Sequence, residues 1–238
     1  AKVLVETGMV KRVEPETKIV LETPTGLVTV YVKWENHMVA SINLENVPAF
    51  LYRKDLHIDL AGYGDVSVDI GYGGNFFVLA DVHSLGLTIT KDTVNLLRSL
   101  SKDILAAANK VIKVAHPTNP AINYLDQVLF CQNVPEEDGG YLAQCIFGDA
   151  QADISPCGTG TSTRLAQRYF RGLIGLEETF VQKSVCGGAF HAKGLRETTL
   201  GGVPAIVPYV SCSDVHITGF NHLIVEENDK LKNGFVSW

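Results

Sequence analysis

The sequence predicts a mixed α/β fold in which strands outnumber helices. Most of the 238 residues fall into short segments that are rich in β-branched side chains and separated by turns. One long segment has apolar residues at a period of about 3.6, which is typical of an amphipathic helix. A second helix is expected directly after a loop rich in glycine and threonine.

The expected strands of the first third carry β-branched residues with partial or full alternation. A turn at residues 24–26 separates the first two. Glycines between residues 71 and 74 indicate a sharp bend or a close approach of another backbone. The segments are 18–22, 27–32, 38–42, 65–70 and the apolar run 76–80.

Three helices are expected. The clearest covers residues 92–113, where Asp92 can cap its start and His116-Pro117 stops the chain from continuing it. The second begins near residues 159–161 and ends at Phe170, with Gly172 as the residue after its C-cap. Residues 1–6 are interpreted as the last turns of a third helix, which Gly8 ends.

Composition excludes several classes of protein. The net charge of −6 argues against a nucleic-acid-binding protein, which usually needs a basic face. No segment approaches the roughly 18–20 apolar residues of a membrane helix, and Glu6 interrupts what would be the apolar core of a signal peptide. The five cysteines form no CxxC pair, so we expect free thiols in a reducing, cytoplasmic setting rather than disulfides or a zinc site.

The segment 153–161 carries the most chemistry. It reads Asp-Ile-Ser-Pro-Cys-Gly-Thr-Gly-Thr, follows an expected strand at 141–147 and precedes the second helix. Small and hydroxylated residues expose several backbone N–H groups at a helix N-terminus. Unpaired donors and the helix dipole attract an anion there, such as a carboxylate or a phosphate.

Cys157 stands just before this helix, where the same field favours a thiolate and lowers the pKa of the thiol. Such a thiol can act as a base or a nucleophile. Asp153 is placed to bind a cationic amine. These residues together predict an amino-acid site, with the carboxylate on the helix end, the ammonium on Asp153 and the thiolate near the α-carbon.

Two other interpretations fit the same residues. Gly-Thr-Gly-Thr can be a simple capped turn, and Cys157 a packed core side chain. A dinucleotide-binding loop is disfavoured, because the third glycine and the acidic residue expected at the end of the following strand are missing.

The chain resembles the proline racemase family, which includes hydroxyproline epimerases and related dehydratases. The resemblance lies in the motif SPCGTGT at residues 155–161 and in several other segments that follow the order of the family pattern. The resemblance runs nearly end to end. The matching segments are 5–8, 46–51, 68–69, 73–77, 116–117, 175–180, 218–221 and 232–235.

The resemblance implies a cofactor-independent racemase or epimerase that interconverts L- and D-proline or epimerises 4-hydroxyproline. Two thiols face opposite sides of the substrate α-carbon: one removes the α-proton as a thiolate, and the other delivers a proton. Cys157 would be one of them. Gly158 and Thr159 would donate backbone N–H groups to the carboxylate, Asp153 would hold the ring nitrogen, and Phe147 would pack on the ring. The resemblance implies no metal and only a small-molecule substrate, and it allows a homodimer.

One departure from the family pattern is large. The second catalytic cysteine of the family lies in a Cys-Gly-His motif, which this sequence does not contain. We expect that motif in a segment that precedes Ala1 in the native protein; loss of racemase activity is the alternative. A smaller departure is Ile154, where members often carry arginine. Structural roles are expected for the other cysteines, which are Cys131, Cys145, Cys186 and Cys212.

The resemblance gives conflicting signals about the substrate. An aromatic residue at the position of Phe147 goes with proline, whereas a polar residue at the position of Gln127 goes with a hydroxylated ring. Dehydratases of the family often carry threonine at the position of Cys157, so the cysteine favours a racemase or epimerase.

The resemblance also implies two pseudo-symmetric, barrel-like α/β halves, each built around a central helix as in diaminopimelate epimerase, with the site between them. On that template residues 67–217 form the second barrel, which carries SPCGTGT. Residues 1–66 and 218–238 form the remnant of an incomplete first barrel, whose exposed sheet edges and apolar surface would make a true fragment poorly soluble.

Three other functions are compatible with parts of the sequence. A non-catalytic protein would bind proline or the planar analogue pyrrole-2-carboxylate without turnover. Acyl transfer by Cys157 would need a histidine partner, and no motif links any of the seven histidines to it. A relative of diaminopimelate epimerase is less favoured, because Ser155-Pro156 precede Cys157 where that family usually has alanine.

Overall fold

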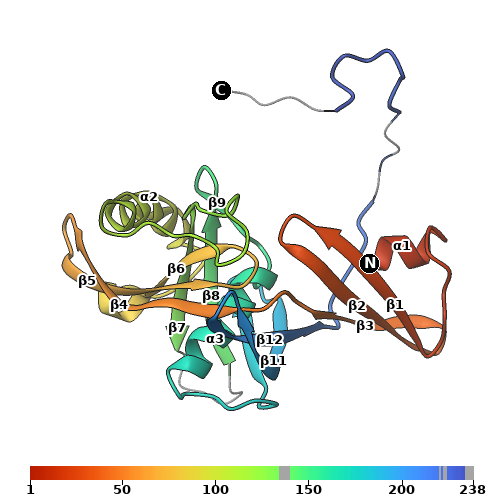
Figure 1. Ribbon diagram of the computed structural model, residues 1–238, viewed down its shortest axis with the longest axis horizontal. Coiled ribbons are helices and arrows are strands. Elements are labelled where there is room, and N and C mark those ends of the chain that lie inside the picture. Colours follow the sequence, from red (N-terminus) through yellow and green to blue (C-terminus); the bar gives the residue numbers. More distant parts are fainter. Residues whose placement is uncertain (134–139, 220, 222–223, 234–238) are drawn as a thin grey trace.

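One mixed sheet of twelve strands forms the frame of the protein in a computed structural model that describes residues 1–133, 140–219, 221 and 224–233 (Figure 1). The strand order is β1-β2-β3-β12-β11-β10-β8-β7-β6-β5-β4, and the short β9 pairs with β8. The pairs β6–β7 and β8–β10 are parallel, and all other neighbours are antiparallel. The predicted mixed α/β class is therefore confirmed, whereas the two pseudo-symmetric barrels stay a prediction.

The helices are α1 (Lys2–Glu6), α2 (Val94–Val111) and α3 (Gly158–Phe170), with a 3₁₀ turn at Val82–Leu85. No helix in the described ranges is long and apolar enough to span a membrane. The strands are β1 (Glu16–Thr23), β2 (Gly26–Glu35), β3 (Met38–Glu45), β4 (Phe50–Leu60), β5 (Gly64–Tyr72), β6 (Phe76–Asp81), β7 (Gln127–Asn133), β8 (Gly140–Phe147), β9 (Gln151–Ala152), β10 (Phe180–Ser184), β11 (Ala189–Leu200) and β12 (Val203–Cys212).

Most segment predictions of the first half are confirmed. The expected strands lie within β1, β2, β3, β5, β6 and β8, and all three expected helices form. Strand β4 does not stand out in the sequence, because the charged run Arg53-Lys54-Asp55 interrupts its alternation. In the structure two register shifts against β5 occur at this run.

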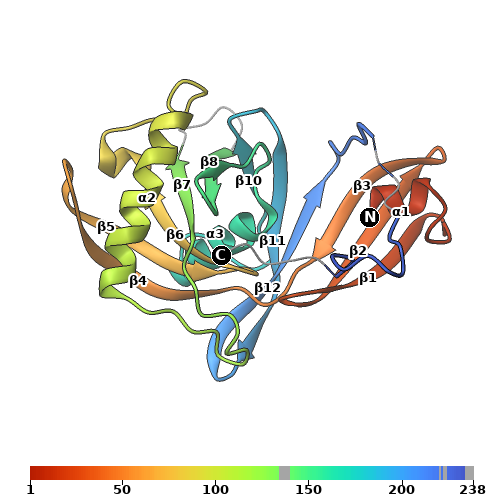
Figure 2. The ribbon, with the colours of Figure 1, turned by 90° about the horizontal axis from the view of Figure 1, so that it is seen from above.

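Helix α2 lies on the outer face of the sheet and packs on β4, β7 and β8 (Figure 2). Its buried residues are Leu97, Leu100, Ser101, Ile104 and Ala108, which form one face of the helix. The expected cap by Asp92 is wrong. Thr93 occupies the N-cap instead. Its hydroxyl shares one hydrogen bond between the carbonyls of Thr88 and Thr90, and this interaction folds the residues before the helix into a turn.

Helix α3 is enclosed by the sheet, with β4, β5, β11 and β12 packed around it. Every residue from Gly160 to Ala166 is buried. The buried hydroxyls of its first turns donate to backbone carbonyls: Thr161 to Pro156 at 3.2 Å, Ser162 to Gly158 at 3.0 Å and Thr163 to Thr159 at 2.8 Å. A polar helix start can therefore lie in the interior without unpaired hydroxyl donors.

Two groups of apolar side chains bear on the expected division of the chain. A small cluster joins α1 to β1 and β2 through Val5, Ile19, Val30, Val32 and Trp34, at the opposite end of the molecule from α2 (Figure 1). The large cluster includes residues of β4 as well as of β5–β8. A boundary near residue 46 would separate these clusters, so the division at 66/67 stays a prediction. The described part of 218–238 contains no helix or strand, and Phe220 and residues 234–235 of the matching segments lie outside the described residues.

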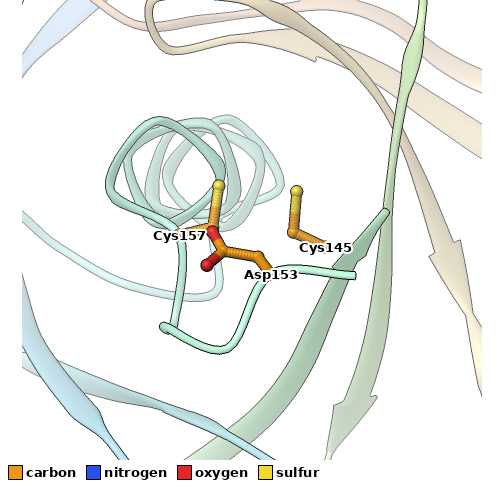
Figure 3. A group of neighbouring side chains, drawn as sticks. All are labelled: Cys145, Asp153 and Cys157. Atoms are coloured by element: carbon orange, nitrogen blue, oxygen red, sulfur yellow. The ribbon is translucent and has the colours of Figure 1, made fainter. Parts of the chain in front are cut away.

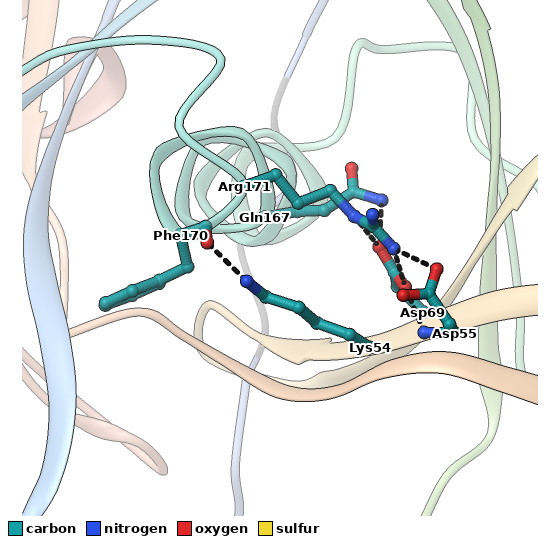
Figure 4. Close-up of polar contacts among 6 residues, drawn as sticks. All are labelled: Lys54, Asp55, Asp69, Gln167, Phe170 and Arg171. Atoms are coloured by element: carbon teal, nitrogen blue, oxygen red, sulfur yellow. Dashed lines mark hydrogen bonds and ion pairs between the residues drawn. The ribbon is translucent and has the colours of Figure 1, made fainter.

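A charged network ties the C-terminal end of α3 to β4 and β5 (Figure 4). Arg171 donates through Nε and Nη2 to the two carboxylate oxygens of Asp69, at 2.7 and 2.6 Å, and through Nη2 to Asp55 at 2.6 Å. The side-chain amide of Gln167 and the backbone N–H of Asp55 also donate hydrogen bonds to the Asp69 carboxylate. Burial alone would raise the pKa of Asp69, but these hydrogen bonds hold the pKa below the usual carboxyl range.

Replacing Arg171 by alanine should lower the free energy of unfolding by about 3 kcal/mol, the lower end for a broken buried pair because Arg171 itself is partly exposed. Urea unfolding near neutral pH measures the loss. Lys102→Ala, which removes an exposed pair with Asp149, is the control and should cost under about 1 kcal/mol. Equal losses in the two variants would contradict this role of Arg171.

The same pair predicts a pH dependence of stability. Because the folded-state pKa of Asp69 lies below its unfolded value of about 3.9, its stabilising contribution is complete above about pH 5 and is lost as the pH falls through the folded pKa. In Arg171→Ala, Asp69 loses the strongest of the hydrogen bonds that lower its pKa, so that pKa rises. Acid unfolding followed by circular dichroism should therefore begin at a higher pH than in the unaltered protein.

Candidate active site

Side chains from two neighbouring strands hold the segment between β9 and α3. Gln144 of β8 donates through Nε2 to the carbonyls of Cys145 and Asp153, at 3.0 and 2.8 Å. From β10, Gln182 donates to the carbonyl of Pro156 at 2.8 Å, and Ser184 donates to that of Ile154 at 2.9 Å. The loop that precedes the helix is therefore fixed to the sheet along its whole length.

Cys157 is the N-cap of α3 and adopts a backbone conformation that is rare outside glycine, with φ 65° and ψ 108°. Its N–H donates to the Ser155 hydroxyl at 3.0 Å, and its Sγ accepts from the N–H of Gly160 at 3.3 Å. The Thr159 hydroxyl lies 3.7 Å from Sγ. The side chain is buried, with 7% exposed.

The loop between β5 and β6 packs directly on the first turns of α3, as its glycines predicted. A Cβ on Gly73 would lie 2.5 Å from the N of Thr163 and 2.6 Å from the O of Thr159. Asn46 connects the two segments through Nδ2, which donates to the carbonyl of Gly73 at 3.0 Å and to the Ser162 hydroxyl at 2.9 Å.

The structure brings the predicted site residues together, and their roles stay predictions. Asp153 lies beside Cys157, and its Oδ1 accepts from the N–H of Ser155 at 2.8 Å. Gly158 and Thr159 form the first turn of α3, where the N–H groups have no acceptor within the helix. Phe147 packs against the hydrophobic cluster that contains Cys157. Ile154 is 76% exposed and makes no part of this group.

Cys145 lies beside this group, although only a structural role is expected for it from the sequence. The ligating atoms of Cys145, Asp153 and Cys157 all lie within 4.8 Å of one another, and the two thiols stand side by side (Figure 3). Cys145 precedes Phe147 by two positions on β8, and alternate residues of a strand share a face. That spacing is the one signal in the sequence that could have placed Cys145 at the site.

The two thiols have opposite pKa shifts. A hydrogen bond from Cys145, followed by those from the Gly160 N–H and the Thr159 hydroxyl, outweighs burial and lowers the pKa of Cys157. The same hydrogen bond and burial raise the pKa of Cys145. The lowered pKa of Cys157 agrees with the expectation from its place at the helix N-terminus.

The other cysteines are not part of the group that Cys145, Asp153 and Cys157 form. Cys131 belongs to the same hydrophobic cluster, and burial raises its pKa. Cys212 is partly buried, and Cys186 is exposed. Among the described residues no histidine is hydrogen-bonded to Cys157; His222 lies outside them. This geometry does not favour the acyl-transfer interpretation.

Cys145, Asp153 and Cys157 are also the ligating side chains that lie close enough to hold one cation in the described part of the chain. Two thiolates and a carboxylate would suit a thiophilic divalent ion. The expectation that no metal takes part stays a prediction.

The two residues with conflicting substrate signals are direct neighbours. Gln127 begins β7 and is paired across the antiparallel ladder with Phe147 at the end of β8. Both side chains are partly buried. One surface therefore presents an aromatic ring and an amide together, next to the cluster that holds Cys157.

Comparison with known proteins identifies the class. A sequence profile described as proline racemase matches residues 1–236. The chain is 39% identical to the proline racemase of Acetoanaerobium sticklandii, over 99% of the chain and 70% of that protein. It is 38% identical to a trans-3-hydroxy-L-proline dehydratase of Burkholderia cenocepacia, over 98% of the chain and 69% of that protein.

A solved structure agrees with these sequence matches. The hydroxyproline epimerase of Agrobacterium vitis with bound trans-4-hydroxy-L-proline superposes with a TM-score of 0.85 at 32% identity, covering 99% of this chain and 67% of that one.

The mixed α/β fold, with a cysteine at the start of a buried helix, thus matches a class of enzymes. Of the relatives named above, the racemase and the epimerase are isomerases. The chain belongs to the proline racemase family. The predicted resemblance and the isomerase class are confirmed at this level.

Gly73→Ala should disturb the start of α3, because the new Cβ would meet backbone atoms that cannot rotate away. We expect a loss of about 1–3 kcal/mol in the free energy of unfolding, as for other overpacked sites. Thermal melting measures it. Gly175→Ala is the matched control, since its Cβ would make only an ordinary contact, 3.7 Å from Glu178. Equal melting temperatures for the two variants would contradict the close packing.

Proposed function

We propose that this protein is a racemase or epimerase of proline or hydroxyproline, and that Cys157 is one of its two proton-transferring thiols. The observation that carries the proposal is the buried Cys157 thiol at the N-terminus of α3, with the lowered pKa that a base near neutral pH requires. Membership of the proline racemase family supplies the reaction class.

The substrate carboxylate would bind the N–H groups of Gly158 and Thr159. These groups stand at the positive end of the α3 dipole, and they are the first unpaired donors of the helix. Asp153 would accept the ring ammonium, because Ser155 engages Oδ1 and leaves the other oxygen for a ligand. A substrate held at both ends presents its α-carbon to the nearby Sγ of Cys157.

The configuration at the α-carbon is then inverted by two proton transfers. The Cys157 thiolate takes the α-proton and becomes a thiol, and the electron pair of the C–H bond passes into the carboxylate. The helix N-terminus stabilises the negative charge that develops there. A second thiol on the opposite face gives its proton to the planar carbon and becomes a thiolate, so the product has inverted configuration.

Cys145 does not fit the role of that second thiol. It lies beside Cys157, with its ligating atom within 4.8 Å, whereas inversion needs a donor on the far side of the substrate. We propose that the second thiol comes from the Cys-Gly-His motif that the family pattern implies, outside this sequence, and that the division into residues 67–217 and a first half made of 1–66 and 218–238 describes the complete fold.

Activity assays on the complete gene product test the proposal. L-proline, trans-4-hydroxy-L-proline and trans-3-hydroxy-L-proline are each incubated in D₂O without added cofactor. A racemase or epimerase changes the optical rotation and incorporates solvent deuterium at the α-carbon, whereas a dehydratase releases water from the 3-hydroxy substrate only. We expect the first result, and Gln127 beside Phe147 makes the 4-hydroxy substrate a specific candidate.

Variants identify the acting thiol. Cys157→Ser should lower kcat by about 10²–10⁴-fold, the usual contribution of a general acid or base. Cys186→Ser, which alters an exposed thiol, should leave turnover unchanged. Full turnover in Cys157→Ser would refute the assignment. Binding of pyrrole-2-carboxylate by the unaltered protein without any turnover would favour the non-catalytic alternative instead.

A further inference from the structure

Three side chains with metal-ligating atoms meet between the β8–β9 hairpin and the start of α3 (Figure 3). They are Cys145, Asp153 and Cys157, and their ligating atoms all lie within 4.8 Å of one another. Neighbouring ligands of a tetrahedral zinc site lie about 3.5–4 Å apart, because each ligating atom is roughly 2.0–2.3 Å from the ion. The three side chains are therefore close to the spacing that one bound ion needs.

The pairing of β8 with β9 explains why these side chains meet. Ile146 pairs with Ala152 in that antiparallel ladder, and the Asp153 N–H continues it by donating to the Cys145 carbonyl at 3.0 Å. Residues directly opposite each other in such a ladder place their side chains on the same face. Hydrogen bonds from β10 fix the loop at 154–156, which brings Cys157 to the other two.

We propose that Cys145, Asp153 and Cys157 bind one thiophilic divalent cation such as Zn²⁺, and that this cation and the substrate exclude each other. Thiolate ligands select zinc over the oxygen-seeking Mg²⁺ and Ca²⁺. The two thiol protons pass to solvent as the sulfurs coordinate the ion, and a fourth position is left for water. The exclusion of substrate rests on the proposed function, whereas the binding of the cation does not.

The surroundings of the three side chains suit a bound cation. Oδ1 of Asp153 accepts from the Ser155 N–H at 2.8 Å, and Sγ of Cys157 accepts from the Gly160 N–H at 3.3 Å. Hydrogen bonds of this kind hold metal ligands in a fixed direction. Two thiolates and a carboxylate exceed the charge of a divalent ion by one, and the positive end of the α3 dipole stabilises that excess.

The same atoms are needed by the proposed reaction. Sγ of Cys157 would take the α-proton, and Asp153 would accept the ring ammonium, so neither is free for the substrate while it coordinates an ion. Cys145 has no part in that proton transfer. It is therefore the residue whose removal should abolish the cation site and leave the proposed base in place.

The experiment titrates the complete gene product, freed of metal by a chelator, with Co²⁺ as a coloured substitute for Zn²⁺. Tetrahedral cobalt with thiolate ligands gives intense visible bands and a sulfur-to-metal charge-transfer band. We expect these bands to saturate at one ion per chain and to disappear when Zn²⁺ displaces the cobalt. X-ray absorption at the zinc edge should then show two sulfur neighbours at about 2.3 Å. Absence of saturable bands would overturn the proposal.

Variants show which thiols bind the ion. Cys145→Ala should weaken Zn²⁺ binding by at least about 100-fold, because losing a ligand exceeds the roughly 10–100-fold effect of losing an outer-shell partner. Cys131→Ala is the matched control: it removes another buried thiol of the same hydrophobic cluster and should bind Zn²⁺ as tightly as the unaltered protein. Unchanged binding in folded Cys145→Ala would overturn the proposal, and so would an equal loss in Cys131→Ala. If the alanine variant does not fold, Cys145→Val fills the space without a ligand and takes its place.

Turnover tests the exclusion of substrate. One equivalent of Zn²⁺ should suppress racemisation or epimerisation by the unaltered protein, and a chelator should restore it. Cys145→Ala, compared with its own rate without zinc, should need at least about 100-fold more Zn²⁺ for the same loss. Zinc that binds without slowing turnover would overturn the exclusion, as would equal sensitivity of the two proteins. If Cys157→Ser retains turnover, the proposed function fails, while the cobalt spectra still decide whether the cation site exists.

Discussion

A helix that begins in the protein interior leaves N–H groups and the positive end of a dipole without water, and this constraint shapes the structure around α3. The hydroxyls of Thr161, Ser162 and Thr163 satisfy local carbonyls. The Cys157 sulfur accepts from the Gly160 N–H. The N–H groups of Gly158 and Thr159, at the first turn, are left without an acceptor in the helix, and an anionic ligand can accept hydrogen bonds from them.

The same constraint explains why so many distant segments meet at one place. The loop before α3 is held by Gln144 on one side and by Gln182 and Ser184 on the other. The glycine loop after β5 approaches from a third direction, and Asn46 connects it to the helix. At the far end, Arg171 fixes the helix to β4 and β5. Both ends of α3 are therefore tied to the sheet, which holds the thiol at a defined position.

The sequence predicted the parts of this arrangement that depend on local patterns. Segment periodicity located α2, α3 and most of the early strands, and the residue types at 153–161 placed Asp153 and Cys157 together before α3. The anion site and reactive thiol that those residue types indicate stay predictions. The order of the strands could not be predicted, because neighbours such as β3 and β12 are far apart in the sequence. The closeness of Cys145 to Cys157 depends on that order as well as on the turn at β9, so only the shared face with Phe147 could be predicted from the sequence.

The conformation of Cys157 has a consequence for how this protein changes over evolutionary time. A left-handed backbone at a residue with a Cβ costs on the order of 1–3 kcal/mol, and glycine would avoid that cost. Proteins tolerate such a burden only while the residue is useful, since stability above the threshold for folding is limited. Glycine would relieve this cost at position 157, so a thiol that is held there at the expense of stability agrees with the role that we propose for Cys157.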